Sequence, residues 1–294
     1  MVVTYRPNLA LLRQALAQCR RQVGGTVVFD NASAASTFDA LADVLDGTEV
    51  LRSPVNIGLA AALNRGIDRA RERGFRYVLL LDQDSVPAEG MVRALRTELE
   101  RLRANGVPAG AVGPQALDAR NGLPAPFVRV GFPFNRKIPG GPGQCIECDF
   151  LISSGCLIPL DVLDQAGAMD EGLFIDNVDL EWCFRVRAAG MKLYGICDAR
   201  MQHAIGDALR PSRVRRGGVF VHRPLRLYYI MRNRVLLYRR RHTPWAWIGQ
   251  DLLRLPMKFC STVLFQPPRR EYLRCMLRGL RDGLRGVVGP ARSD

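Results

Sequence analysis

The chain alternates short apolar runs with segments whose apolar residues recur every three or four positions. The runs predict strands at residues 2–5, 26–29, 49–51, 77–81 and 109–113, and the periodic segments between them predict helices. Because strands and helices alternate, we expect right-handed βαβ crossovers and a mostly parallel sheet flanked by helices, an α/β fold. The first strand starts at the very beginning of the chain, so we expect the native start to lie a few residues upstream.

The run at residues 77–81 ends in two acids, Asp82 and Asp84. Five consecutive apolar residues indicate a strand that is buried on both faces. If strand geometry persists, both carboxylates project to the same side beyond the carboxyl end of the strand, where ligands of open α/β sheets bind. Two carboxylates suit Mg²⁺ or Mn²⁺. A solvated turn with an Asp cap on the next helix fits the same pattern, so this stretch alone leaves both interpretations open.

A second acidic cluster lies at residues 170–181, where five acids alternate with large apolar side chains. A solvated face would not be interleaved in this way. Asp179 falls near the start of a predicted helix that runs to about residue 189, where the macrodipole favours the ionised carboxylate. An ordinary acid in the first turn of a helix fits this position equally, so the segment alone does not decide its role.

Three other features bear on a possible site. The Gly- and Pro-rich residues 114–145 predict a long loop that serves as a functional flap. Ser154-Gly155 predicts a tight junction, in which the glycine permits a close backbone approach to an acceptor or to a neighbouring strand. His203 follows a predicted strand at residues 192–196, although a lone histidine is more often structural than a ligand.

The composition is that of a globular protein, with 294 residues, 48% of them hydrophobic and 24% charged. No run of apolar residues is long enough to span a membrane, and no secretory signal is visible, so we expect a cytoplasmic protein. Neither a dinucleotide-binding G-x-G-x-x-G nor a P-loop is present. The eight cysteines are scattered through apolar surroundings, which favours buried thiols over a disulfide framework.

The net charge of +14 belongs to the C-terminal third of the chain. Residues 210–294 contain 20 Lys and Arg against 4 Asp and Glu, whereas residues 1–209 contain 22 and 24. Basic amphipathic segments here, broken into pieces by prolines, predict that residues 245–289 contact an anionic membrane surface, at the inner face of the cell membrane. A helical cap packed on the sheet domain fits the same pattern equally well. Nucleic acid is disfavoured, because aromatic residues are not interleaved as stacking platforms.

Through several short motifs and their order, the chain resembles the family 2 glycosyltransferases of the GT-A fold, and specifically their bacterial rhamnosyltransferase branch. The motifs are Val2 to Asn8, Val28 to Ser33, Asn56 to Ala60 with Asn64 and Gly66, Leu81 to Ser85, Ser154-Gly155, Asp176 to Trp182, His203 to Asp207, and Tyr228-Tyr229 with Arg232-Asn233. Together they cover about residues 1–235. Many family members have Glu-Asp where this chain has Val178-Asp179, which makes Asp179 the better match for the base and leaves Asp176 and Glu181 as competitors.

The resemblance implies a role for each matching residue. The nucleotide-sugar side would comprise Thr4, Asp30, Asn56, Gly58, Asn64 and Asp82. The metal would be held by Asp84, with His203 as a possible partner. The catalytic pair would be Asp179, acting as the base, and Glu181, and the acceptor side would comprise Ser154, Gly155, Asp176 and Trp182.

The implied reaction is an inverting, metal-dependent transfer of a sugar from a nucleotide donor. The resemblance points to dTDP-rhamnose as the donor and to Mg²⁺ or Mn²⁺ as the metal. The acceptor would be a hydroxyl of a lipid-linked or saccharide precursor of a cell-surface polysaccharide or glycolipid. We expect a nucleotide-sugar half at residues 1–115, an acceptor half at 116–222 and a basic helical region at 223–294, and an oligomer stays possible. The alternatives are transfer of another sugar, a sugar nucleotidyltransferase and a non-catalytic membrane-peripheral scaffold.

Overall fold

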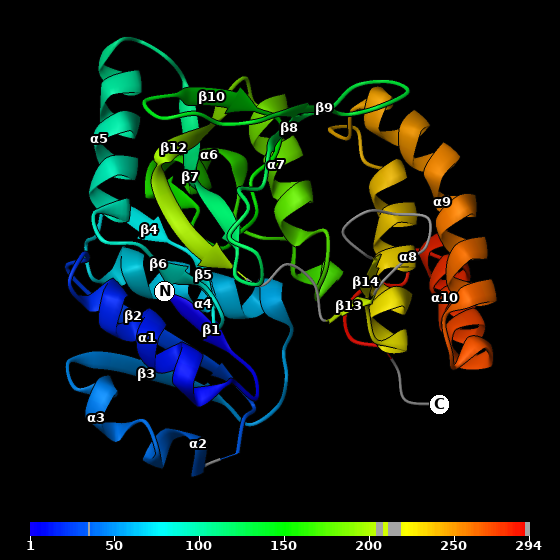
Figure 1. The fold of residues 1–294 in the computed structure, drawn as a ribbon, viewed down its shortest axis with the longest axis horizontal. Coiled ribbons are helices and arrows are strands. Elements are labelled where there is room, and N and C mark those ends of the chain that lie inside the picture. The colour runs from blue at the N-terminus through cyan, green and yellow to red at the C-terminus, as the bar shows by residue number, and fades with distance from the viewer. Residues whose placement is uncertain (35, 204–207, 211–218, 292–294) are drawn as a thin grey trace.

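Two adjoining sheets form the body of the protein in the computed structural model, which describes residues 1–34, 36–203, 208–210 and 219–291 (Figure 1). The first sheet has 4 parallel strands in the order β3-β2-β1-β5. These are β1 (Val2–Thr4), β2 (Thr26–Asn31), β3 (Thr48–Ser53) and β5 (Leu81–Asp82). Because all four run the same way, the polar residues that follow β1, β2 and β5 lie at one edge of this sheet.

The second sheet is mixed, with the order β10-β12-β7-β11-β4 and β6 paired to β12. Its long central strands β7 (Ala109–Asp118) and β12 (Lys192–His203) are parallel, and the other pairings are antiparallel. The remaining strands are β4 (Tyr77–Leu79), β6 (Val86–Pro87), β10 (Cys145–Cys148) and β11 (Leu157–Pro159). The predicted α/β class with a mostly parallel sheet is confirmed, with these antiparallel additions.

The predicted strand at residues 77–81 divides between the two sheets. Its first part, β4, pairs antiparallel with β11, whereas β5 pairs parallel with β1. Between them, the Leu80 N–H donates to Cys156 O at 3.0 Å and the Leu81 N–H donates to Met1 O at 3.0 Å. Both faces of the segment are buried, so the sequence correctly predicted a central strand. The assumption that all its neighbours are parallel was wrong, because the long connection after β7 lets the chain return as an antiparallel β11.

Helices cover both sides of the body. Asn8 accepts hydrogen bonds from the N–H groups of Ala10 and Leu11 and so caps α1 (Leu9–Arg20), which buries Leu12, Leu16 and Cys19 as its spacing predicted. The others are α4 (Leu59–Glu72), α5 (Met91–Ala104), α6 (Leu160–Ala166), α7 (Val178–Ala188), the short α2 (Ser36–Asp39) and α3 (Ala42–Leu45), and the 3₁₀ turn η1 (Glu171–Leu173).

The Gly- and Pro-rich stretch predicted as a flap is more regular than expected. Strand β7 continues through its first residues to Asp118, and a hairpin of β8 (Phe127–Arg129) and β9 (Arg136–Ile138) fills its middle. A second small hairpin, β13 (Ala208–Arg210) with β14 (Val219–Val221), precedes the C-terminal helices.

The C-terminal helices are α8 (Pro224–Tyr238), α9 (Trp245–Phe265) and α10 (Arg269–Leu284). Leu236, Leu237, Trp247 and Ile248 belong to the same buried cluster as the sheet body, so α8 and the start of α9 pack directly on it. Pro256 was expected to break the second helix, but α9 continues through it. The neighbouring Leu255 and Phe259 pack against α8 and α10, and this packing holds the helix together where Pro256 cannot donate a backbone hydrogen bond.

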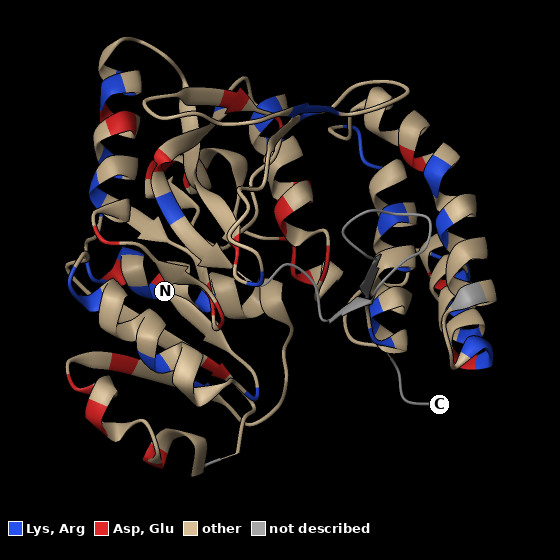
Figure 2. Ribbon diagram, in the orientation of Figure 1, with Lys and Arg blue, Asp and Glu red and all other residues tan. Residues whose placement is uncertain are grey.

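Charge is distributed as the sequence predicted. Lys and Arg predominate on α8, α9 and α10, whereas acids and bases are mixed over the sheet body (Figure 2). In the part of the chain that is described, no helix is both long and apolar enough to cross a membrane. The eight cysteines are free, and burial raises the pKa of Cys148 to about 12, which disfavours a thiolate in the Cys145-x-x-Cys148 pair.

Candidate active site

Asp82, Asp84 and His203 meet at the edge where β5 ends. Each offers one ligand atom, and these atoms all lie within 4.8 Å of one another. Asp82 ends β5 and Asp84 lies in the turn that follows it, while His203 is the last residue of β12 and its Nδ1 is 3.7 Å from Asp84 Oδ1. Two carboxylates and an imidazole form a donor set that fits a divalent cation. Asp82 was predicted on the nucleotide side, and its carboxylate lies among the possible metal ligands as well.

Two buried serines support this group from behind. Ser154 Oγ accepts the backbone N–H of Asp82 at 3.0 Å and donates to Ser85 Oγ at 2.7 Å. Ser85 Oγ in turn lies 2.7 Å from His203 Nδ1. Since both serines are fully buried, this chain of hydrogen bonds fixes the backbone of Asp82 and the ring of His203 relative to each other. The sequence analysis included Ser85 in a family motif but gave it no role.

The electrostatics bring a third carboxylate to the same place. Burial raises the pKa of Asp82 to about 6; the charge of His203 lowers this pKa, and the charges of Asp84 and Asp179 raise it. Asp179, at the start of α7, is therefore within electrostatic range of Asp82 although it lies far away in the sequence. Burial also raises the pKa of Asp179, with a further increase from Asp176 that the N–H of Leu180 opposes. An acid with a raised pKa is a stronger base once ionised.

The loop that leads into Asp179 has an unusual backbone. Phe174, Asp176 and Asn177 all have positive φ, at 64°, 62° and 61°. Asp and Asn tolerate this conformation, whereas a bulky residue such as Phe174 adopts it only where the surroundings enforce it. At the beginning of α4, the N–H groups of Leu59 and Ala60 donate to Phe174 O at 2.7 and 3.3 Å.

Helix α8 holds the other side of this loop. The side-chain amide of Asn233 donates to the carbonyl oxygens of Leu173, Ile175 and Asp176 at 2.8–2.9 Å. The neighbouring Arg232 also donates to Leu173 O, at 3.0 Å, and both side chains are fully buried. The basic helical region therefore contributes directly to the position of Asp179. The sequence offered one signal for this, the Arg232-Asn233 pair that the family motifs include.

The carboxyl ends of β1 and β2 form a second part of the site. Thr4 Oγ1 donates to Asp30 Oδ1 at 3.1 Å, and the Ser33 N–H donates to Asp30 Oδ2 at 3.1 Å. Beside them lies an open pocket of about 630 Å³, lined by Arg6, Pro7, Leu9, Ala32, Ser33, Ala34, Ser36 and Thr37. A pocket of this size accommodates a small ligand such as a nucleoside.

Two asparagines connect this pocket to the start of α4. Asn31 Nδ2 donates to Asn56 Oδ1 at 3.0 Å, and Asn56 Oδ1 also accepts the Gly58 N–H at 2.9 Å. Gly58 has φ of +89°, and a Cβ at this position would lie 2.6 Å from the Phe174 ring. Glycine is therefore required at this contact between α4 and the loop before Asp179.

Comparison with known proteins agrees with this arrangement. The sequence profile described as "Glycosyl transferase family 2" matches residues 1–147. A protein of Shigella flexneri named dTDP-rhamnosyl transferase RfbF is 30% identical over 294 residues, which is 99% of this chain and 97% of that one. The chain belongs to glycosyltransferase family 2. It is a glycosyltransferase that is similar to a rhamnosyltransferase.

Solved structures agree on the fold of this glycosyltransferase. GalNAc-T7 with UDP, GalNAc and Mn²⁺ matches with a TM-score of 0.61 at 13% identity, covering 97% of this chain and 55% of that one, so this chain spans about half the length of that protein. TarS residues 1–349 of S. aureus in complex with UDP-GlcNAc matches with a TM-score of 0.59 at 14% identity, covering 97% of this chain and 80% of that one. The predicted GT-A fold is confirmed.

Asn64 lies away from the glycosyltransferase's acidic group. It was expected to border the nucleotide, but its side-chain amide donates to Met169 O and to Glu171 Oε1, both at 2.9 Å, while its oxygen accepts the Met169 N–H. Asn64 is also buried. In this structure Asn64 holds α4 against the segment that precedes the loop, and its position beside the nucleotide stays a prediction.

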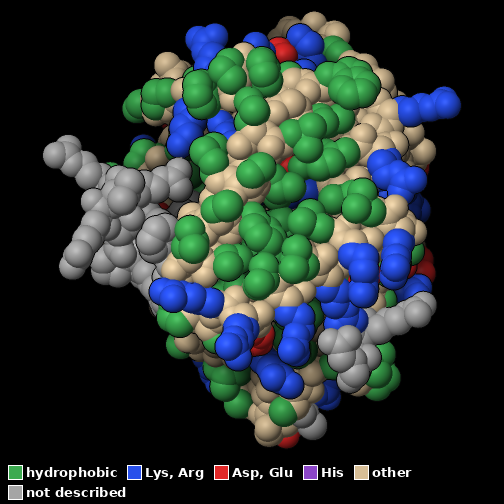
Figure 3. Space-filling view, turned by 90° about the vertical axis from the view of Figure 1, so that its right-hand side faces the viewer, with side chains coloured by type: hydrophobic (Ala, Val, Ile, Leu, Met, Phe, Trp, Pro, Cys, Tyr) green, Lys and Arg blue, Asp and Glu red, His purple; other side chains and the backbone are tan. Residues whose placement is uncertain are grey.

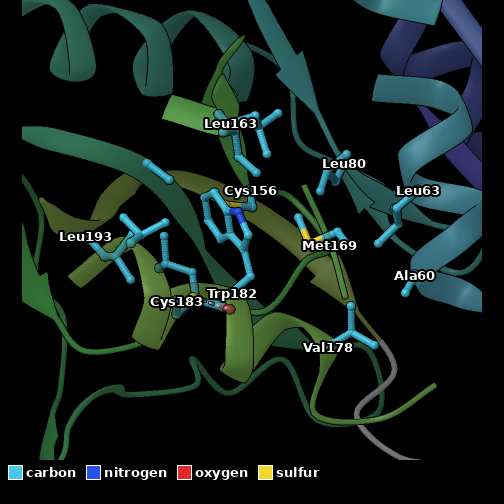
Figure 4. Packing of buried hydrophobic residues seen from close by; sticks show 14 of the residues in the cluster. Ala60, Leu63, Leu80, Cys156, Leu163, Met169, Val178, Trp182, Cys183 and Leu193 are labelled. Carbon is cyan, nitrogen blue, oxygen red and sulfur yellow. Dashed lines mark hydrogen bonds between the residues drawn. The ribbon is translucent and has the colours of Figure 1, made fainter. Parts of the chain in front are cut away.

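Glu181 and Trp182 also differ from expectation. The Glu181 carboxylate is fully buried, with ion pairs to Arg185 at 2.8 Å and Arg240 at 3.6 Å, and the imidazole of His242, whose pKa is lowered by burial, lies 2.9 Å from it. Trp182 packs among Cys156, Leu163 and Met169 in the centre of the core (Figure 4), and its indole N–H donates to Gly167 O at 3.1 Å. Neither side chain is available to an acceptor, because both are buried in the core.

The other acceptor-side residues are near the acidic group, and each has a structural partner. Ser154 supports Asp82 as described above. A Cβ on Gly155 would lie 2.5 Å from Pro114, so its close approach is to a neighbouring strand. The Arg226 guanidinium holds the Asp176 carboxylate, with N–O distances of 3.0–3.2 Å, and the charge of Arg226 also acts on the pKa of Asp82. Arg226, at the start of α8, was not predicted from the sequence.

Proposed function

We propose that this glycosyltransferase moves rhamnose from dTDP-rhamnose to an acceptor hydroxyl, with inversion at the anomeric carbon and with Mg²⁺ or Mn²⁺. The observation that carries the proposal is the convergence of Asp82, Asp84, His203 and Asp179, all far apart in the chain except the first pair. The name of the Shigella flexneri relative, a dTDP-rhamnosyl transferase, supports the donor. GalNAc-T7, which shares the fold, binds UDP together with Mn²⁺, and this supports a divalent cation.

Each acidic residue has a separate role in the proposed reaction. Asp82, Asp84 and His203 would hold the cation, which when bound neutralises charge on the departing nucleoside diphosphate. Asp179 would take the proton from the acceptor hydroxyl as that oxygen attacks the sugar. Its buried position suits this step, because the raised pKa increases the basicity of the carboxylate.

The donor and the acceptor would approach from different sides. Thr4 and Asp30 would contact the nucleobase in the pocket beside β1 and β2, with Asn56 and Gly58 bordering the nucleotide. The acceptor hydroxyl would enter near Asp176 and Arg226, where α8 faces the acidic group. The predominance of Lys and Arg on α8, α9 and α10, on this side of the site, supports an acceptor that is a lipid-linked or saccharide precursor of a cell-surface polysaccharide.

The test combines a panel of sugar nucleotides with two variants. With Mn²⁺ and an acceptor extract, dTDP-rhamnose should release dTDP and label the acceptor, and Asp179→Asn should lower the rate by about 10²–10⁴ while leaving donor affinity unchanged. Asp68→Asn, an exposed acid on α4, is the matched control and should keep the wild-type rate. Release of pyrophosphate would instead indicate a nucleotidyltransferase, and no turnover of any donor would favour a non-catalytic scaffold. A wild-type rate in Asp179→Asn would refute the base assignment.

A further inference from the structure

Helix α9 carries a continuous apolar strip on its outer face. Its large members are 51–83% exposed: Trp245, Leu252, Leu253, Met257 and Leu264. Their spacing follows the helical period, so they line one side of the helix. The charged residues of α9, Asp251, Arg254 and Lys258, are each at least partly buried and lie off the strip. Contiguous exposed apolar surface of this kind marks an interaction site.

The tip of the β8–β9 hairpin extends the strip. Phe132 and Phe134 at this tip are 63% and 73% exposed. Gly249 of α9 faces the Phe132 ring, which lies 3.1 Å from the position of a Cβ on that glycine, and Gln250 donates a hydrogen bond to Asn135. Two segments that are more than a hundred residues apart in sequence therefore present aromatic and aliphatic side chains side by side.

Basic residues surround this surface. The exposed basic residues on the hairpin, before α9 and on α10 include Arg136, Lys137, Arg241, Arg269, Arg270 and Arg274. Of the three acids in α9 and α10, Asp251 and Asp282 are buried, which leaves Glu271 as the exposed one. Figure 3 views the molecule from this side and shows hydrophobic side chains gathered over the middle of the face, with Lys and Arg below and beside them.

We propose that this face docks on the surface of a bilayer that contains anionic lipid. The apolar strip and the two hairpin phenylalanines would enter the interface between headgroups and acyl chains, and the arginines around them would contact lipid phosphates. A second copy of the chain is a less favourable partner for this face. A two-fold contact would bring the arginines around the face of one copy close to those of the other, and they would repel each other. The proposal concerns binding alone and does not depend on the identity of the donor or acceptor.

The position of α9 relates this face to the site. Lys258, on the inner side of α9, lies close enough to Asp176 and Arg226 for their charges to act on its pKa. A single helix thus separates the proposed membrane face from the acceptor side of the acidic group. An acceptor anchored in the bilayer would reach the site around this helix.

The test is sedimentation of the full chain with vesicles. Vesicles with about 30% phosphatidylglycerol in phosphatidylcholine should bind the protein, pure phosphatidylcholine should bind it weakly, and raised salt should reduce binding. Met257→Glu should weaken binding at least about tenfold. Its matched control is Leu123→Glu, since Leu123 is 63% and Met257 64% exposed but Leu123 lies in a turn of the sheet body.

The arginine rim is tested separately. Arg270→Gln with Arg274→Gln should lower binding about 25-fold, about fivefold for each arginine. Arg21→Gln, directly after α1, with Arg65→Gln on α4 should leave binding unchanged. Circular dichroism and donor binding check that each variant folds. Equal binding of the variants and their controls, or no binding by the wild type, would overturn the proposal. A dimer detected by light scattering that Met257→Glu dissociates, without lipid binding, would assign the face to a second copy instead.

Discussion

The raised pKa of Asp82 gives a direct test of whether the separate carboxylates share one site. A carboxyl group binds a divalent cation only when it is ionised, so metal affinity should fall as pH falls through the pKa of Asp82. That pKa is raised to about 6 by burial, with further contributions from Asp84 and Asp179. Mn²⁺ affinity should therefore be full above pH 7 and should fall below pH 6, where Asp82 becomes protonated.

The size of the effect separates this carboxyl from an ordinary one. With a pKa of about 6, Asp82 is ionised in about 90% of molecules at pH 7 and in about 10% at pH 5, so the apparent affinity should fall about ninefold between them. If the pKa of Asp82 had its ordinary value of 3.8, the carboxyl would still be ionised in about 94% of molecules at pH 5. The change in Mn²⁺ affinity between pH 7 and pH 5 would then be too small to detect.

Isothermal titration of the protein with Mn²⁺ between pH 5 and pH 7.5 measures this dependence. Asp179→Asn removes a negative charge that raises the pKa of Asp82, so its midpoint should move to lower pH, and Asp68→Asn should leave the midpoint unchanged. Because histidine ligands also bind metal only when neutral, the titration is repeated in His203→Gln. The dependence should persist there, with its midpoint moved to higher pH, since the charge of His203 lowers this pKa. If Mn²⁺ affinity of the wild type did not change with pH, or if Asp179→Asn left the midpoint unchanged, the carboxylates would not share one site.

Three further variants test the supports of the site. Asn233→Ala removes three hydrogen bonds to buried carbonyls and should lower the free energy of unfolding in urea by about 2 kcal/mol or more, with a larger loss of turnover than of donor binding. Gly58→Ala should cost about 2 kcal/mol in the same assay, because φ is +89° and the Phe174 ring occupies the space; an unchanged unfolding curve would contradict both. Ser154→Ala should weaken Mn²⁺ binding about tenfold although no ligand is removed, whereas the neighbouring Ser153→Ala should not.

The parts of the site that the sequence could predict are those fixed by local geometry. Asp82 and Asp84 directly follow a buried strand, and Asp179 begins a helix, so their surroundings follow from the apolar pattern on either side. The same local reasoning failed for Glu181. At about 100° per residue, Glu181 lies about 200° around α7 from Asp179, which turns it into the protein, where Arg185 and Arg240 neutralise its charge. The helical period alone could have separated these two acids.

Other contacts depend on tertiary structure that no local pattern contains. Ser85 and Ser154 are 69 positions apart, and each is a small polar residue of a kind common in turns. Their importance appears only when the segment before β11, residues 154–156, returns beside Leu80 and Asp82 and both hydroxyls are buried. The antiparallel return of β11 likewise could not be predicted, because residues 157–159 look the same in either direction. Strand direction was decided by the chain connection.

The loop before Asp179 connects the C-terminal helices to the proposed catalytic base. Phe174, with φ of 64°, would relax if nothing opposed it, and strain of this kind costs of the order of 1–3 kcal/mol. Hydrogen bonds hold the loop in this conformation against the strain. They come from Asn233 and Arg232 on α8 and from the N–H groups at the start of α4. Because α9 and α10 pack against the same α8, we expect membrane binding at the proposed face to stabilise the loop before Asp179 as well. Vesicles should therefore raise the turnover of the wild type with a soluble acceptor more than that of Met257→Glu, and equal stimulation would show that the two regions act independently.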